Sequence, residues 1–332
     1  MKKYRRTRRF WIIGLGALGL AAALLLLPYF IPLSQASQTL QGLKQMPFSN
    51  SEVIDIACNS FHYRMYPALA DSVKGKVLLV HGLGGSTFSY EESAPQLARD
   101  GWLILSVDLP GFGYSSRNPN YNHDQANRAL DLWTLLDGVD SQLSPQLAQM
   151  PWFLAGHSMG GGTVAAMAIK DEARTAGLIL IDPALSEAGG GSILTQFPPA
   201  VRLMQVALER FLLSEAGVRR FLTSAYGRAP TPEEISGYLA PLTLPGTARM
   251  AKNLFKSADV PDAALLSKTS LPILAIWGSL DTWVPPDESQ KLLDIRPDAE
   301  IYIIEGAAHC PMETHTQEFV QILLDWLQEQ TL

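Results

Sequence analysis

Short apolar runs and amphipathic stretches alternate along most of the chain. Aliphatic or aromatic runs of strand length lie at residues 76–80, 102–107, 152–155, 178–181, 272–277 and 300–304. Helical patterns lie between or after them, at 90–99, at 123–137, from 159 onward and at 317–330. A preceding pair of runs, 52–57 and 63–67, predicts a β-hairpin. The pattern therefore predicts an α/β fold: a mostly parallel eight-stranded sheet with helices on both faces and ligands at the carboxyl ends of the strands.

The pattern changes between residues 184 and 268. Gly189–Gly191 predicts a flexible hinge, and residues 201–213 and 218–226 have the spacing of amphipathic helices. Thr231, followed by a proline and two glutamates, is typical of the start of another helix. We therefore expect a helical cap at 184–268, inserted into a core made of residues 51–183 and 269–332.

The N-terminal segment differs from the rest. Six basic residues precede an uncharged stretch whose apolar core runs from Trp11 to Leu27. A stretch of this length can cross the ~30 Å hydrocarbon layer of a bilayer, with its basic flank on the cytoplasmic side. We expect a basic tail and transmembrane anchor at 1–33, a linker at 34–50 and an exported body.

Two other interpretations of this segment stay open. One is a cleaved signal peptide, with Ser34 and Ala36 as small residues before the cut. The other is a twin-arginine signal, because Arg8 and Arg9 precede the apolar run. Either one would also export the body, but without a permanent anchor.

Composition and charge exclude further classes of protein. The chain has 332 residues, of which 47% are hydrophobic and 17% charged, as in a globular protein with a sizeable core. Without the six N-terminal cations, 20 basic and 32 acidic residues remain, a net charge of −12 against −6 for the whole chain. Such an acidic body disfavours nucleic acid as a partner, because phosphate binding needs a cationic surface. No Cys/His spacing fits a zinc site, so no metal is expected.

One motif carries the candidate chemistry. Gly156-His157-Ser158-Met159-Gly160 follows a strand-like run and precedes an alanine-rich helical one. In this context, G-x-S-x-G is the pattern of a nucleophile elbow, which holds the serine in a strained turn with its hydroxyl exposed above the sheet. The flanking glycines allow neighbouring backbone segments to approach closely. Ser158 is therefore the candidate nucleophile.

The sequence resembles the α/β-hydrolase superfamily over residues 51–332. Besides the serine motif, the resemblance rests on His81-Gly82-Leu83-Gly84-Gly85 after the third strand, on Asp108-Leu-Pro-Gly-Phe-Gly-Tyr-Ser115 after the fourth, and on His309 after the last. It is nearest to capped lipases and esterases of the monoacylglycerol-lipase type. The resemblance implies a serine, an acid and a histidine in that chain order.

A serine hydroxyl needs an imidazole to take its proton and a carboxylate to orient the imidazole. His309 follows the last strand through a turn that resembles the family's histidine loop, and His315 is its rival. Asp281 follows the penultimate strand, where the family usually places its acid, and Asp182 after the preceding strand is the alternative. The predicted catalytic residues are Ser158, Asp281 and His309.

The resemblance also implies roles for main-chain groups. The N–H groups of Leu83 and Met159 are the predicted oxyanion hole. Asp108 and its neighbouring glycines are expected to shape a turn beneath the site. Because the family's sheet order places Cys58 and Cys310 towards opposite edges, we expect two free thiols.

Together these assignments imply a membrane-anchored serine hydrolase without metal or organic cofactor. The anchor and the apolar cap favour carboxylic esters, lipids with medium or long acyl chains above all. Two alternatives stay open, because one fold hosts many functions. They are cleavage of another acyl or a carbon–carbon bond, and a non-catalytic binding protein that kept the fold.

Overall fold

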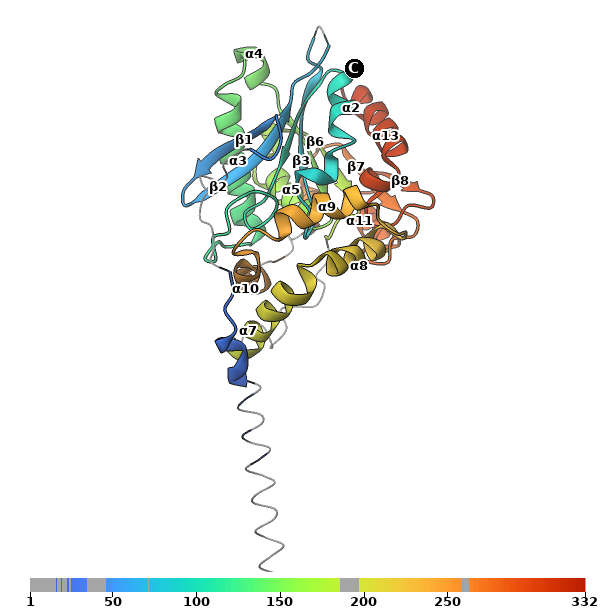
Figure 1. Ribbon diagram of the computed structural model, residues 1–332. Coiled ribbons are helices and arrows are strands. Elements are labelled where there is room, and N and C mark those ends of the chain that lie inside the picture. Colours follow the sequence, from blue (N-terminus) through green and yellow to red (C-terminus); the bar gives the residue numbers. More distant parts are fainter. Residues whose placement is uncertain are drawn as a thin grey trace, which may run out of the picture.

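The computed structural model describes residues 25–34, 46–70, 72–185, 197–257 and 263–331, together with 16, 19, 23 and 259 (Figure 1). Its strands are β1 (Ser51–Ile56), β2 (Asn59–Tyr66), β3 (Gly75–Val80), β4 (Trp102–Val107), β5 (Trp152–His157), β6 (Thr175–Ile181), β7 (Ile273–Gly278) and β8 (Glu300–Ile304). Its labelled α-helices are α2 (Ala94–Arg99), α3 (Gln125–Asp140), α4 (Pro145–Ala148), α5 (Met159–Lys170), α7 (Pro198–Ala207), α8 (Glu215–Tyr226), α9 (Pro232–Leu242), α10 (Thr247–Ser257), α11 (Glu288–Ile295), α12 (Pro311–Thr314) and α13 (Thr316–Glu329). Short 3-10 turns are formed by Thr87–Tyr90, Glu172–Arg174 and Ala263–Lys268, and a π-helical turn by Leu208–Leu212.

The strands form one eight-stranded sheet in the order β1-β2-β4-β3-β5-β6-β7-β8. Strand β2 is antiparallel to β1 and β4, and the remaining neighbours are parallel. Along β3, Leu78 and Val80 join the core on one face, and Val77 and Leu79 join the core on the other. Both faces are covered, by α3 and α5 on one side and by α2 and α13 on the other (Figure 1). The predicted mostly parallel α/β sheet is confirmed.

Local sequence explains where some helices begin. The expected helix at 90–99 is divided into the 3-10 turn Thr87–Tyr90 and α2, whose first turn contains a proline. Proline lacks an N–H and suits only the start of a helix. At Thr231, where the sequence predicted the start of a helix, α9 begins, and Thr231 and Glu234 form a reciprocal capping box there.

The described residues between β6 and β7 are helical. They form α7, the π-helical turn Leu208–Leu212, α8, α9 and α10, which lie together beyond the carboxyl ends of the parallel strands (Figure 1). Gly227, with φ +66°, ends α8 in a left-handed conformation that suits glycine. The hinge expected at Gly189–Gly191 lies outside the described residues.

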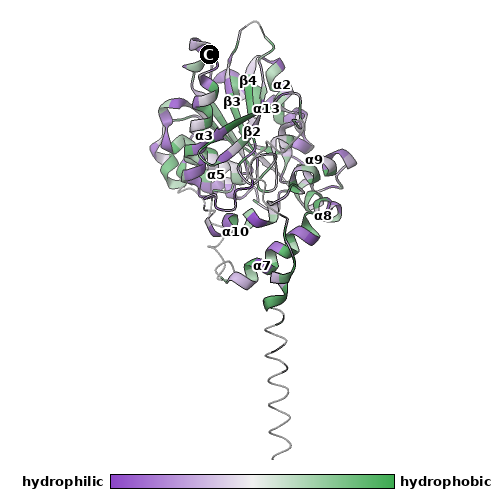
Figure 2. Cartoon of the chain, turned by 60° about the vertical axis from the view of Figure 1, so that its left-hand side comes forward, coloured by the Kyte–Doolittle hydropathy of each residue, from purple (hydrophilic) through white to green (hydrophobic). Residues whose placement is uncertain are grey.

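The end of the N-terminal apolar stretch contacts this helical segment. Residues 25–30 are helical and lie beside α7, and Figure 2 colours them as hydrophobic. Arg202 Nε donates to Pro28 O at 3.0 Å, Arg249 Nε donates to Ser34 O at 2.7 Å, and Ser34 N donates to Glu209 Oε1 at 3.1 Å. Within the described part of the chain, no helix has the length and apolarity needed to cross a bilayer. Most of the anchor expected at 1–33, and residues 35–45 of the expected linker, lie outside the described residues.

Candidate active site

Ser158 lies at the sharp joint between β5 and α5. Its backbone has φ +49° and ψ −116°, a conformation that is strained for any residue with a side chain. The Ser158 N–H donates to Ile181 O at 2.9 Å, which ties the joint to the neighbouring strand β6. A Cβ atom on Gly160 would overlap the carbonyl oxygens of Val80 and His81, so only glycine allows α5 to start this close to β3. The surrounding backbone therefore fixes the Ser158 side chain.

Two loops at the same edge of the sheet bring an acid and a base together. Asp281 follows β7 and His309 follows β8, and both side chains are buried. His309 Nδ1 lies 2.7 Å from Asp281 Oδ2, while Asp281 Oδ1 accepts the N–H groups of Trp283 at 2.7 Å and Val284 at 3.1 Å. Burial opposes ionisation of Asp281, but its hydrogen bond to His309 and the charge of that residue lower the Asp281 pKa below its usual value. With Nδ1 held by the carboxylate, His309 Nε2 can accept a proton.

His157 joins this pair to the elbow. Its Nε2 lies 2.7 Å from His309 O, and the two rings are 4.7 Å apart. Burial, reinforced by His309, lowers the pKa of His157 well below its usual value, so its ring is neutral and donates to the carbonyl. Among the described residues, no hydrogen bond joins Ser158 Oγ to His309; such bonds often tighten only when substrate binds.

The predicted oxyanion donors lie around the same serine. A Cβ atom on Gly82 would lie 3.1 Å from Ser158 Cβ, so the loop that carries Leu83 passes directly over the elbow. Met159 begins α5, where the first N–H groups of a helix have no partner within the helix. In the described part of the chain, neither the Leu83 nor the Met159 N–H donates to a protein acceptor. Both are thus free to bind a substrate oxygen.

Trp283 covers the imidazole, and sequence reasoning missed it. Its ring lies 4.9 Å from the ring of His309 and 5.1 Å from that of Phe221 on α8. Its indole N–H donates to Ser224 Oγ, also on α8, at 2.9 Å. A large aromatic residue two positions after the candidate acid was the available signal.

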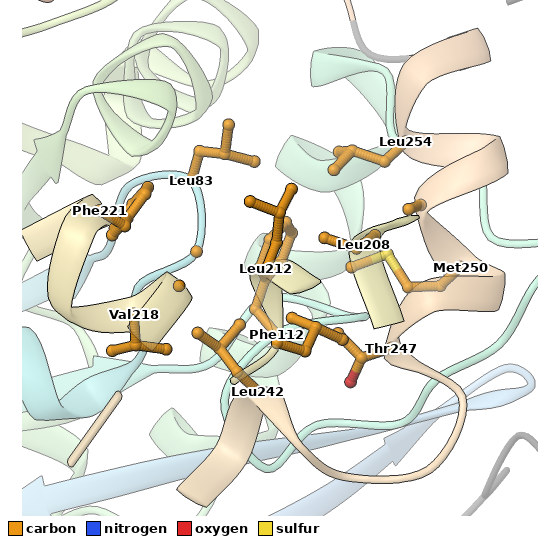
Figure 3. Close-up of a pocket in the computed structure, with 14 residues that line it drawn as sticks. Leu83, Phe112, Leu208, Leu212, Val218, Phe221, Leu242, Thr247, Met250 and Leu254 are labelled. Atoms are coloured by element: carbon orange, nitrogen blue, oxygen red, sulfur yellow. The ribbon is translucent and has the colours of Figure 1, made fainter. Parts of the chain in front are cut away.

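An apolar cavity of about 250 Å³ lies between the core and the helical segment (Figure 3). Leu83, Gly84 and Phe112 line it from the core, and the remaining lining residues come from the segment between β6 and β7. Thr247 is the one lining residue with a polar side chain. Ser158 and His309 do not line the cavity, but Leu83 and Gly84, which do, follow Gly82 in the loop that lies against the elbow.

The rival triad residues occupy other positions. His315 lies at the start of α13, with Nδ1 3.0 Å from Thr314 Oγ1. Asp182 is buried next to Asp281, and the side-chain ligand atoms of Asp182, Asp281 and His309 lie within 4.8 Å of one another. Three such groups could hold a metal ion, but Asp281 Oδ2 and His309 Nδ1 are hydrogen-bonded to each other and would have to give up this hydrogen bond to bind one. The structure places Asp281, and not Asp182, against the imidazole.

A second set of serine, histidine and aspartate side chains comes from β1, β2 and the loop after β4. His62 Nδ1 is 2.7 Å from Asp108 Oδ2, and His62 Nε2 is 2.8 Å from Ser51 Oγ. Asp108 also accepts the N–H groups of Thr87 and Tyr114, as expected of a residue that shapes a turn. Ser51 lies in a regular strand, and its hydroxyl accepts the Phe48 N–H at 3.1 Å. This second set lacks the strained elbow that exposes Ser158.

The two cysteines are free thiols in the structure. Cys58 is exposed between β1 and β2, and Cys310 is buried after β8. These strands stand at opposite ends of the sheet order.

Comparison with known proteins identifies the family. Residues 71–314 match the family described as "Serine aminopeptidase, S33" (Hydrolase_4). The pimeloyl-[acyl-carrier protein] methyl ester esterase of Neisseria meningitidis is 25% identical over 79% of this chain and 95% of its own length. The sn-1-specific diacylglycerol lipase ABHD11 of Mus musculus is 24% identical over 77% of this chain and 82% of its own. The crystal structure of a membrane phospholipase A superposes with a TM-score of 0.67 at 20% identity, covering 97% of this chain and 99% of that one. The chain therefore belongs to the Hydrolase_4 family of the α/β-hydrolase superfamily.

Proposed function

We propose that this protein is a membrane-anchored serine hydrolase that cleaves carboxylic esters with medium or long acyl chains. The observation that carries the proposal is the bonded pair Asp281–His309, tied through His157 to the strained elbow of Ser158. This combination supplies a nucleophile, a base and an orienting acid. The curated relatives named above act on esters or on diacylglycerol, which supports the same class of reaction.

The reaction follows from these positions. Ser158 Oγ attacks the acyl carbonyl while His309 Nε2 takes its proton, and Asp281 stabilises the imidazolium. The N–H groups of Leu83 and Met159 bind the oxyanion. His309 then protonates the leaving alcohol, and a water molecule, activated by the same imidazole, hydrolyses the acyl-enzyme.

The cavity favours an acyl chain over a peptide. An aminopeptidase has to bind a charged α-ammonium group, which needs an acidic or polar partner when it is buried. The lining residues are apolar apart from Thr247, so the cavity offers no counter-charge. Its volume of about 250 Å³ lies near the lower end of the range of ligand pockets, which fits one acyl chain rather than a whole lipid.

The surface beside the cavity supports delivery from a membrane. The terminal helical residues Leu26, Leu27 and Phe30 are exposed, and so are Leu203 and Phe211 on the adjacent helical segment. Several exposed apolar residues next to an apolar N-terminal stretch are typical of a surface that lies against lipid. We place the body on the exported side, with the basic tail in the cytoplasm.

Labelling with a fluorophosphonate probe tests the enzyme class. We expect label on wild type and none on Ser158→Ala, whose turnover falls by about 10⁴-fold or more. Ser51→Ala is the matched control, because Ser51 is the serine of the other serine–histidine–aspartate set. This variant should be labelled like wild type. An unlabelled wild type would favour a non-catalytic binding protein, and label retained in Ser158→Ala would assign another nucleophile.

A panel of esters graded by acyl length tests the substrate class. We expect kcat/KM to rise from acetate towards medium or long acyl chains and to be low for aminoacyl amides, because the cavity is apolar. A flat response to chain length, or a preference for the amides, would contradict the assignment.

A further inference from the structure

A second buried carboxyl group lies beside Asp281. Asp182 follows β6 directly and has no exposed surface. Its Oδ1 accepts the Gly278 N–H at 3.0 Å, and its backbone N–H donates to Ile276 O at 2.9 Å. The backbone has φ +41°, which is uncommon for a residue other than glycine. The fold therefore holds this carboxyl group in place at the expense of a strained backbone.

The two carboxyl groups differ in the donors that they receive. Asp281 accepts three N–H groups, from His309, Trp283 and Val284. Asp182 accepts one, from Gly278, and its buried Oδ2 has no N–H or hydroxyl donor among the described residues. A side-chain oxygen of Asp182 nevertheless lies within 4.8 Å of a side-chain oxygen of Asp281. Two buried carboxyl groups this close do not both ionise readily, and a hydrogen bond between them requires that one of them carries a proton.

The difference in donors decides which group is protonated. Three N–H donors favour the anion at Asp281, and the single donor at Asp182 favours it less. Burial, reinforced by the charge of Asp281, raises the pKa of Asp182 well above its usual value. The other titratable groups that interact with this pair are His309 and Cys310, from the loop after β8, and His157 at the end of β5, whose ring is neutral. None of these groups provides a second cation that would stabilise a charged Asp182.

We propose that Asp182 is a neutral carboxylic acid that donates a hydrogen bond to Asp281 and thereby positions the carboxylate that orients His309. It acts through Asp281 and is a positioning residue. The expected effect of Asp182 on turnover rests on the proposed function of Ser158, whereas the proton on Asp182 does not depend on that function.

Two substitutions of Asp182 test whether this residue acts as a hydrogen-bond donor or as a negative charge. In Asp182→Asn, the amide N–H can donate to Asp281 and the amide oxygen can accept from Gly278, so we expect kcat within about threefold of wild type. In Asp182→Leu, the donor is lost, and kcat should fall by about 10- to 100-fold with little change in KM. Equal losses in both variants would mean that a charged carboxylate is needed, and an unimpaired Leu variant would mean that Asp182 positions nothing. Either result overturns the proposal.

Infrared difference spectroscopy of the full chain gives a readout that needs no turnover. We expect the carbonyl stretching band of a neutral carboxylic acid in wild type at about pH 9, where Glu313, with a pKa of about 7, is ionised. The band should vanish in Asp182→Asn and persist in Ser158→Ala. A wild type without the band overturns the proposal even if the enzyme is active. A wild type with the band but without fluorophosphonate labelling would refute the proposed function and still support a proton on Asp182.

Discussion

Two serines in this chain belong to similar sets of side chains, and only one of them is placed to react. Ser51 lies 2.8 Å from His62, which in turn lies 2.7 Å from Asp108. Its hydroxyl faces a buried imidazole from a regular strand and also accepts a backbone N–H. Ser158 has the left-handed φ of the elbow and two unused N–H groups close by. At the scale of the residue, backbone conformation distinguishes a nucleophile from a structural hydroxyl.

A substitution of Gly160 tests whether the strained backbone of Ser158 is needed for its reactivity. A methyl group there would overlap the backbone of Val80 and His81, which cannot move without shifting β3. We expect Gly160→Ala to lower the melting temperature by several degrees, through a loss of about 1–3 kcal/mol, and to abolish fluorophosphonate labelling.

Gly306→Ala is the control for this experiment. Gly306 also has a positive φ, +79°, but an added Cβ would meet only the His315 side chain, at 3.8 Å. It should lose only the ~1 kcal/mol of a left-handed alanine and keep its label. If Gly160→Ala behaved the same way, the close approach of α5 to β3 would not be what holds Ser158.

Sequence alone identified the residues next to local motifs better than those that meet only in the fold. The elbow and the loops after β7 and β8 each carry a short sequence motif, so Ser158, Asp281 and His309 could be predicted as a set. The catalytic role of these three residues stays a prediction. Trp283 and Asp182 take part through contacts between loops that follow different strands. No spacing along the chain encodes those contacts.

At the scale of elements, buried strands were predictable and helix boundaries were not. The apolar runs of β3, β4 and β5 are continuous because both faces of the sheet are covered, and this pattern is visible in the sequence. Strand β6 begins at Thr175, three residues before the expected run, because Thr175 and Gly177 pair with β5 although glycine is a poor strand former. Pairing with a neighbour outweighs local propensity there.

A carboxyl group fastens the helical segment to the core. Tyr226 of α8 and Tyr238 of α9 each donate to Glu313 on α12, at 2.6 Å. Burial raises the pKa of Glu313 to about 7, although the hydrogen bonds from these tyrosines oppose the shift. The folded pKa thus lies above the ordinary value of 4.5. The folded protein therefore binds this proton more tightly than the unfolded chain does.

The sign of the pH dependence follows. The contribution of Glu313 to stability is complete below about pH 4.5 and is lost as the pH rises through about 7, by at most ~3 kcal/mol. We expect the free energy of unfolding of wild type to fall more between these values than that of Glu313→Gln, which has no proton to lose. Urea titrations across this range measure it, with Glu318→Gln on the exposed face of α13 as the control. Parallel curves for wild type and Glu313→Gln would contradict the expected role.

At the scale of the whole molecule, the N-terminal stretch and the helical segment form one end of the protein. Arg202, Arg249 and Glu209 bind the backbone of Pro28 and Ser34, so residues 25–34 are fixed against α7 and the turn that follows it. The exposed side chains at this end include Phe30 and Phe211, while the sheet extends away from it (Figures 1 and 2). A protein held to a bilayer by its N-terminal stretch would present this end to the lipid.

Vesicle assays test this orientation. In Leu203→Glu/Phe211→Glu, two charges replace exposed apolar side chains. Hydrolysis of esters embedded in vesicles should fall by about 100-fold or more, because two apolar side chains that contribute roughly 1.5–3 kcal/mol each are lost. Hydrolysis of a soluble short-chain ester should not change. Leu130→Glu, at an exposed position on α3, is the control. Equal losses of activity on soluble and embedded esters would indicate damage to the candidate active site and not to binding at the vesicle surface.

Trp283 stands between the imidazole of His309 and α8. An outward movement of α8 would remove Ser224, the hydrogen-bond partner of the indole, and would free Trp283 to uncover the imidazole of His309. If substrate enters by such a movement, its entry and the exposure of the base would be coupled through this one side chain.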